Sequence, residues 1–199
     1  MQATPKRILL IGADGVIGLH VHGALSAKYE VIRAGLNGPD LTLDLADATS
    51  LTDKLAALGP LDAVISTAGH ARFAPVDATA PADIDTSVYG LGLKDKLLGQ
   101  VNLALAARRI LRPDGSITLT SGTTRHDPIL GGSSLSMVNG ALDHWVQRRR
   151  RRFAPCASTR SARAWSKAHR QPPSQHFPAL RWCRATRSLL LTCAVLKAD

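Results

Sequence analysis

Three glycines spaced three residues apart, Gly12, Gly15 and Gly18, have the clearest chemical meaning in this sequence. They follow a short β-rich run over residues 7–11 and precede a segment whose apolar residues have helical spacing. In a strand-turn-helix unit, the first glycine permits a tight turn, the second lets a ligand approach the backbone, and the third lets the helix pack closely. Free N–H groups at the positive end of the helix then favour a diphosphate. The pattern predicts a dinucleotide site formed by Gly12, Asp14, Gly15, Val16, Ile17 and Gly18.

The elements that must position this turn alternate regularly along the first three quarters of the chain. Strands are predicted over residues 7–11, 30–34, 41–43, 61–66 and 116–120. Helices are predicted over residues 15–27, 46–58, 91–111 and 133–147, and the third is expected to end at the turn-forming residues 112–115. Strands separated by helices of this length imply a parallel sheet with right-handed crossovers. The sequence therefore predicts an α/β fold, a Rossmann-type doubly wound parallel sheet, within residues 1–147.

Length and composition narrow the setting in which this domain works. A chain of 199 residues with 45% hydrophobic residues can bury one α/β core. No apolar run approaches the roughly 18 residues of a membrane span, and the first strand starts too early to leave room for a signal peptide. Cys156, Cys183 and Cys193 are too sparse and irregular for a zinc site or a disulfide framework. We expect a cytoplasmic protein with no metal site and no membrane partner.

Charge is distributed unevenly, which divides the chain near Gln147. Residues 1–147 carry 12 Lys/Arg and 14 Asp/Glu, whereas residues 148–199, here called the tail, carry 13 Lys/Arg and one acid, Asp199. The tail has no helical or strand periodicity, and its composition is typical of a basic, disordered segment. Its arginine block at residues 148–152 could neutralise nucleic-acid phosphates, but the tail lacks aromatic stacking platforms and a recognition fold, so no nucleic-acid partner is expected.

Further motifs follow the glycine turn in a fixed order. Asp44-Leu45 follows the third predicted strand, and Ser66-Thr67-Ala68-Gly69 ends the fourth. Gly99-Gln-Val-Asn102 lies on the long helix, and Gly115-Ser-Ile-Thr-Leu-Thr-Ser121-Gly122 contains the next strand. In this order and spacing, residues 6–147 resemble the short-chain dehydrogenases/reductases, particularly the small members of that family. The resemblance implies an NAD(P)-dependent oxidoreductase acting on a carbonyl or alcohol, with Asp44 and Leu45 at the adenine and Ala68 and Gly69 beside the cofactor.

The end of the second predicted strand bears on the choice between NADP and NAD. NAD enzymes place a carboxylate there to hold the ribose diol, but this chain has Gly35-Leu36-Asn37. Arg33 lies just upstream, so we expect NADP, with Arg33 or Asn37 near the 2′-phosphate and NAD as the less favoured cofactor. The arginine that the family often places at this strand end is Leu36 here. The alternative for Arg33 is a solvated cation at the edge of the strand.

The catalytic pattern of the family is incomplete. The resemblance implies a Ser that holds the substrate oxygen, a Tyr that passes a proton and a Lys four residues later that lowers the pKa of the Tyr. Ser121 matches the Ser, but Leu135 stands at the Tyr position and Asn139 at the Lys position. Neither residue can perform proton chemistry, and the two tyrosines of the chain, Tyr29 and Tyr89, lie outside this helix.

The groups that remain for proton transfer are Ser121, Lys96, Thr123 and His126. We take Ser121 and Lys96 as the catalytic candidates, because a lysine ammonium can polarise a carbonyl or shuttle a proton. A solvated surface charge is the alternative for Lys96, and a loop-stabilising role is the alternative for His126. Since the Tyr and Lys are missing, a non-catalytic NADP-binding or sensing protein is the second functional hypothesis. Relatives pair through their long helices, so the resemblance also implies a homodimer or homotetramer.

The tail has the properties expected of a reading-frame error. Family members continue after the last helix with a segment resembling R-I-N-x-V-S-P-G, which is missing here. Residues 156–167, Cys-Ala-Ser-Thr-Arg-Ser-Ala-Arg-Ala-Trp-Ser-Lys, are compatible with codons that in another frame read R-I-N-A-V-S-P-G-L-V-E. The arginine block likewise becomes an alanine-like run. We therefore hypothesise that a frameshift occurs between Gln147 and Arg152, so that the C-terminal strands of the fold are missing or disordered.

Overall fold

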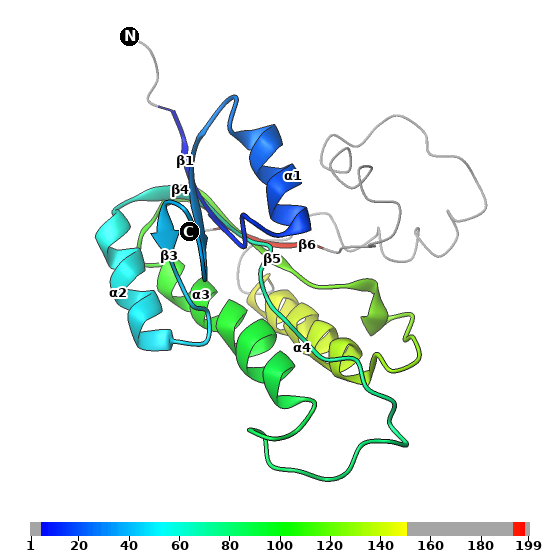
Figure 1. Cartoon of the computed structure of the whole chain (residues 1–199). Helices are drawn as coiled ribbons and strands as arrows, with labels where there is room; N and C mark the ends of the chain where they lie inside the picture. Colours follow the sequence, from blue (N-terminus) through cyan, green and yellow to red (C-terminus); the bar gives the residue numbers. More distant parts are fainter. Residues whose placement is uncertain (1–4, 151–192, 198–199) are drawn as a thin grey trace, which may run out of the picture.

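The computed structural model of the protein describes residues 5–150 and 193–197. A sheet with the strand order β3-β2-β1-β4-β5-β6 forms its centre (Figure 1). The first five strands are parallel to their neighbours, and β6 pairs antiparallel with β5. The predicted Rossmann-type parallel sheet is thereby confirmed. The strands are β1 (Arg7–Ile11), β2 (Glu30–Gly35), β3 (Leu41–Thr42), β4 (Leu61–Ser66), β5 (Leu111–Thr120) and β6 (Cys193–Lys197).

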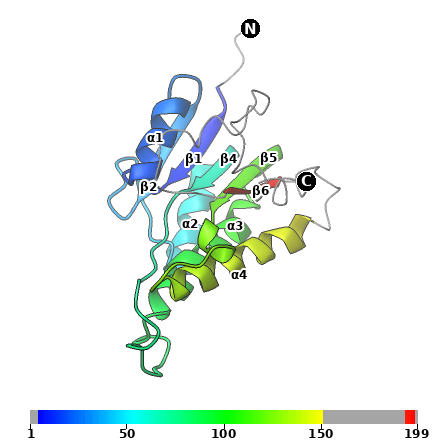
Figure 2. The same ribbon diagram turned by 90° about the vertical axis from the view of Figure 1, so that its right-hand side faces the viewer.

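Helices cover both faces of this sheet (Figures 1 and 2). Helix α1 (Val16–Leu25) lies on one face, and α2 (Ala48–Leu58), α3 (Gln100–Ala107) and α4 (Ser133–Arg150) lie on the other. The main core forms between the sheet and these three helices, because alternate strand residues point toward them. Leu9, Ile117, Leu103 and Leu142 are fully buried there. This packing fixes the carboxyl ends of β1, β4 and β5 along one edge.

The long helix predicted over residues 91–111 differs from expectation in two ways. Its first half, η1 (Gly92–Gly99), is a π-helix, and its α-helical half ends at Ala107, so the predicted end is wrong by four residues. Glycines at both ends of η1 are pressed against other elements: a Cβ on Gly92 would lie 3.0 Å from Val138, and one on Gly99 would lie 2.8 Å from Leu45. π-Helical turns occur frequently at functional sites.

The turn-forming residues 112–115 end no helix, because they lie inside β5. The pairing passes from Leu61 opposite Leu111 to Ala63 opposite Ser116, so these four residues bulge outward at Asp62. Asp114 takes a φ of 66°, a conformation that Asp tolerates, and a Cβ on Gly115 would lie 2.8 Å from the carbonyl oxygen of Arg112. The turn chemistry was therefore predicted correctly, but its place in the fold was not.

The tail contributes β6, a strand that the sequence pattern did not predict, next to β5. Residues 151–192, which include the frame-shifted segment 156–167, lie outside the described residues. Within the described ranges, none of the helices has both the length and the apolar content needed to cross a membrane.

Candidate functional site

The glycine turn has the geometry that its sequence predicts. Gly12 has a φ of 77°, and a Cβ at this position would lie 2.8 Å from the backbone N of Ala68. A Cβ on Gly18 would collide with the carbonyl oxygen of Gly12. Both positions therefore require glycine, because the turn packs on the end of β4 and α1 packs on the turn. A Cβ on Gly15, in contrast, would meet only the Gly12 oxygen, at 3.4 Å.

The N-terminus of α1 is open for an anion. Gly15, at the N-cap, provides no side-chain hydrogen bond, and the first turn contains no acidic residue. Among the described residues, the amides of Val16 and Ile17 have no acceptor, although Leu19 N donates to the Gly15 oxygen at 2.9 Å. Asp14, Gly15 and Val16 are exposed. Unpaired N–H groups at the positive end of a helix, below an exposed glycine, fit a dinucleotide diphosphate.

The predicted adenine residues follow β3, and they differ in exposure. Asp44 is exposed, and one of its carboxylate oxygens accepts from Ala46 N at 2.8 Å. The other oxygen has no partner among the described residues, so it can accept from an adenine amine. Leu45 is buried against Gly99, so its side chain supports the site from within the core.

Arg33 is engaged by a carboxylate within the chain. Its Nε lies 2.9 Å from Asp40 Oδ2, its Nη2 lies 3.0 Å from Oδ1, and its backbone N donates to Oδ2 at 2.9 Å. These hydrogen bonds lower the pKa of Asp40 and raise that of Arg33. Asp14 is a second carboxylate whose charge reaches Arg33. The predicted phosphate ligand is therefore paired already, whereas Asn37 is exposed and without a hydrogen-bond partner among the described residues.

Lys96 lies against Gly69, in the segment that follows β4. Gly69 has a φ of 123°, and a Cβ on it would lie 2.9 Å from Lys96 Cγ. Burial lowers the pKa of the Lys96 ammonium, and the charge of Asp95 partly opposes that shift. The ammonium makes no hydrogen bond or ion pair with any described residue. A fully solvated surface charge, the alternative for Lys96, does not describe this side chain, because it is partly buried at the sheet edge.

Ser121 occupies a different environment from the one that its predicted role requires. Its side chain is 1% exposed, and its Oγ donates to the carbonyl oxygen of Asn139 at 3.1 Å. Asn139 in turn donates from Nδ2 to Thr124 Oγ1 at 2.9 Å, and its Oδ1 is buried without a partner. In this structure Ser121 therefore joins β5 to α4 and does not present its hydroxyl to a substrate.

Gln100 makes buried hydrogen bonds that the sequence did not predict, although it lies inside one of the motifs quoted above. Fully buried, it donates from Nε2 to the oxygens of Lys96 and Thr120 at 3.1 and 3.0 Å, and its Oε1 accepts from Thr120 N at 2.9 Å. The side chain thus joins η1 to the end of β5, beside Ser121.

His70 and Asp95 form a second feature that the sequence did not indicate. Asp95 Oδ2 accepts from His70 N at 2.7 Å and lies 2.9 Å from His70 Nδ1. Tyr89, which lies outside the helix that should carry the catalytic Tyr, has its hydroxyl 3.2 Å from Ser133 Oγ at the start of α4. Neither contact is visible in the sequence, because each joins residues more than twenty positions apart.

The remaining proton-donor candidates have weaker support. His126 Nε2 accepts a hydrogen bond from Arg125 Nε at 2.8 Å. Arg125 also pairs with Asp143 at 3.2 Å, with both side chains largely buried. His126 therefore contacts Arg125, which in turn anchors this loop to α4. Thr123 is partly exposed and makes no side-chain hydrogen bond among the described residues.

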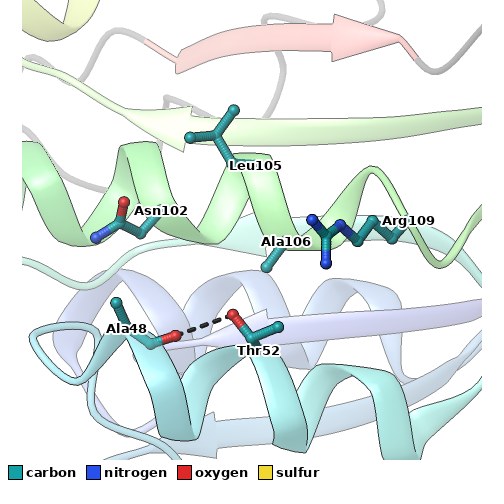
Figure 3. A pocket seen from close by; sticks show the side chains of 6 residues that line it. All are labelled: Ala48, Thr52, Asn102, Leu105, Ala106 and Arg109. Carbon is teal, nitrogen blue, oxygen red and sulfur yellow. Dashed lines mark hydrogen bonds between the residues drawn. The ribbon is translucent and has the colours of Figure 1, made fainter.

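A hollow of about 150 Å³ lies between α2 and α3 (Figure 3). None of the predicted site residues lines it. Thr52 Oγ1 donates to the Ala48 oxygen at 2.9 Å inside α2, and Ala106 points toward that helix in Figure 3. The other lining residues are Asn102, Leu105 and Arg109. Within the described residues, no cluster of His, Cys, Asp or Glu is arranged to hold a metal ion.

Several solved structures have a fold similar to that of this chain. No family model matches the chain, and no curated protein matches it. The crystal structure of the protein lin1944 from Listeria innocua is 38% identical, with a TM-score of 0.65, and the match covers 70% of this chain and 68% of that one. A small-chain dehydrogenase in complex with NADPH is 23% identical, with a TM-score of 0.64 and coverages of 76% and 67%. A short-chain dehydrogenase/reductase from Brucella melitensis is 18% identical, with a TM-score of 0.64 and coverages of 75% and 68%.

The fold is therefore that of the short-chain dehydrogenases/reductases, with a glycine turn at the carboxyl end of β1. The chain belongs to the same family as lin1944 of Listeria innocua.

Proposed function

We propose that this chain is an NADP-dependent oxidoreductase of the short-chain dehydrogenase/reductase type that acts on a carbonyl or alcohol substrate. The observation that carries the proposal is the uncapped N-terminus of α1 below the exposed Gly15. Its free amides and helix dipole would hold the diphosphate, with Asp44 at the adenine and Gly69 and Lys96 toward the reacting end. A bound nicotinamide would supply hydride transfer. A similar fold that was solved with NADPH supports the choice of cofactor.

The residues of the chain would supply charge and shape around that group. Lys96 can polarise a carbonyl oxygen, because its ammonium is partly buried and has no counter-ion among the described residues. Gln100 would keep Lys96 in place through its backbone oxygen.

A second candidate function is a non-catalytic NADP-binding or sensing protein. It is favoured by Leu135 and Asn139 at the positions of the proton-transfer pair, and by the buried hydroxyl of Ser121. Steady oxidation of NADPH in the presence of a panel of aldehydes and ketones would distinguish the enzyme from the sensor.

Gly15→Asp tests the binding site directly, because the fold has room for the new side chain. An aspartate at an N-cap is compatible with the helix, but its carboxylate would repel a diphosphate. We expect NADPH affinity, measured by fluorescence titration of the full chain, to fall at least roughly 100-fold. Gly23→Asp, on the same helix with nothing within 4 Å of its Cβ, is the matched control. Equal binding by both variants, or no binding of NADPH or NADH to the parent chain at millimolar concentration, would refute the proposal.

A further inference from the structure

We propose that His70 and Asp95 form a proton-transfer dyad at the carboxyl edge of β4, in which His70 Nε2 exchanges a proton with the substrate oxygen. The inference rests on the proposed oxidoreductase function and names the acid-base group that Leu135 and Asn139 cannot supply.

The geometry of the pair is that of an oriented imidazole. A single oxygen of Asp95, Oδ2, receives both the backbone N–H of His70 at 2.7 Å and the ring Nδ1 at 2.9 Å. Two bonds to one acceptor fix the position of the ring and place a proton on Nδ1, which leaves Nε2 unprotonated in the neutral tautomer. The Asp95 side chain is 18% exposed, whereas that of His70 is 74% exposed. The reactive nitrogen is thus accessible while its partner is held within the fold.

His70 belongs to the segment after β4 whose preceding residues contact the glycine turn and Lys96. Ala68, two residues before His70, lies against the glycine turn, because a Cβ on Gly12 would be 2.8 Å from Ala68 N. Two residues of extended chain span at most about 7 Å, so the Cα of His70 lies within that distance of the Cα of Ala68. Gly69, between them, packs on Lys96 through its positive-φ backbone. Asp95 and Lys96 are consecutive residues of the π-helix η1, which therefore supplies both charged groups next to His70.

The other candidate groups are less suited to this step. Ser121 Oγ donates a hydrogen bond to the backbone oxygen of Asn139 within the core, and the Tyr89 hydroxyl contacts Ser133 Oγ at the start of α4. His126 Nε2 already accepts from Arg125. Of the histidines at the carboxyl ends of β4 and β5, His70 is the one with a carboxylate on one nitrogen and no partner on the other among the described residues.

In the oxidation of an alcohol, His70 would remove the proton of the hydroxyl group. The O–H bond of the substrate breaks and an N–H bond forms at His70 Nε2, so the imidazole becomes an imidazolium that Asp95 stabilises. A bound oxidised nicotinamide would accept the hydride of the adjacent C–H bond, which would balance the loss of the proton and turn the alcohol into a carbonyl. In carbonyl reduction the same proton returns from Nε2 to oxygen.

The first test measures position without requiring turnover. The full chain, labelled with ¹⁵N-histidine, is titrated with NADPH and followed by NMR, with His144 on α4 as the internal reference. We expect the Nε2 resonance of His70 to shift on saturation and that of His144 to stay unchanged. Asp95→Ala, which leaves no side-chain acceptor, should remove the preference for the Nδ1-protonated tautomer. An unmoved His70 resonance in a chain that binds NADPH overturns the dyad alone, whereas no NADPH binding by fluorescence overturns the proposed function as well.

The second test measures chemistry with the carbonyl panel. His70→Ala should lower turnover by about 100-fold or more, keep NADPH affinity, and regain part of the activity when imidazole is added. His144→Gln is the control and should keep the parent rate. A His70→Ala variant that turns over normally or is not rescued by imidazole contradicts the inference. So does a Tyr89→Phe variant that loses the rate while His70→Ala keeps it.

Discussion

At Arg33, charge within the chain competes with any phosphate that a ligand brings. The guanidinium hydrogen-bonds both oxygens of Asp40, and the charge of Asp14 also helps to raise the pKa of Arg33. A 2′-phosphate must displace Asp40 or share Arg33 with it. Under the proposed function, a preference for NADP over NAD would therefore depend on Asp40 as well as on Arg33.

Asp40→Asn should therefore increase the affinity for NADPH by about fivefold, because removing one exposed carboxylate frees the guanidinium. The affinity for NADH, which has no 2′-phosphate, should change less than twofold. Paired fluorescence titrations at fixed ionic strength measure both values. Asp53→Asn, which removes an exposed acid on α2, controls for net charge. An equal gain for NADH and NADPH would show that Arg33 does not reach the phosphate.

The buried charge of Lys96 lowers the stability of the folded chain by an amount that depends on pH. Burial lowers the pKa of Lys96 in the folded state, so the unfolded chain binds this proton more tightly. The free energy of unfolding therefore rises with pH between the lowered pKa and the ordinary lysine pKa of about 10.4. Lys96→Met should therefore raise the melting temperature at pH 7 by on the order of 3 °C, and the gain should shrink as pH approaches about 10. Thermal unfolding from pH 7 to 10.5 measures this, with the exposed Lys28→Met as control. A gain that does not vary with pH would indicate better packing and not desolvation of a charge.

At the scale of elements, Gln100 joins η1 to β5 through three buried hydrogen bonds. Gln100→Leu fills a similar volume but leaves the N–H and oxygen of Thr120 buried without partners. We expect a loss of about 3 kcal/mol in the free energy of unfolding, measured by urea denaturation, because each unsatisfied group costs about 1–3 kcal/mol. Asn102→Leu, two residues along α3 at the hollow, should change it by less than about 1 kcal/mol. A similar small loss in Gln100→Leu would mean that water or a shift of η1 satisfies Thr120.

Local chemistry explains which elements could be predicted from the sequence. The bounds of β4 match the prediction, and the start of α2 is capped by Asp47, which accepts from Ser50 N at 3.0 Å. The β-rich run and the cap each depend only on residues close together in the sequence. The π-helical η1 depends instead on Gly99 packing against Leu45, more than fifty residues away in the chain. No periodicity of residues 91–99 can report such a contact.

The candidate site divides in the same way. Gly12 and Gly18 could be identified because backbone geometry alone requires glycine there. The His70–Asp95 and Arg33–Asp40 pairs could not, because a side-chain pair depends on where two segments meet after folding. The hydrogen bond of Ser121 could not be predicted for the same reason, since α4 supplies the carbonyl oxygen that its hydroxyl contacts.

At the scale of the whole molecule, the edge of β5 accepts a strand from the tail. Backbone groups of β6 pair with β5 from Ser116 opposite Lys197 to Thr120 opposite Cys193. An open sheet edge presents unpaired N–H and C=O groups to any extended apolar segment within reach. The pairing is antiparallel, whereas every other strand pair of the sheet is parallel. A strand that joins the edge in this way need not be the one that the family places there.

The origin of the tail can be decided from the nucleotides of the gene. If a frameshift precedes residue 153, codons 156–167 should encode R-I-N-A-V-S-P-G-L-V-E in the alternative frame, and the codons of the arginine block should read as an alanine-rich helix. The fall from 14 acidic residues in positions 1–147 to one in the tail would then follow from the shifted codons and not from selection for a basic partner. Sequencing this region checks the prediction, and a frame without that string would disprove it. The same frameshift would change the proposed enzyme, because a corrected chain would continue α4 and could place a parallel strand where β6 now pairs.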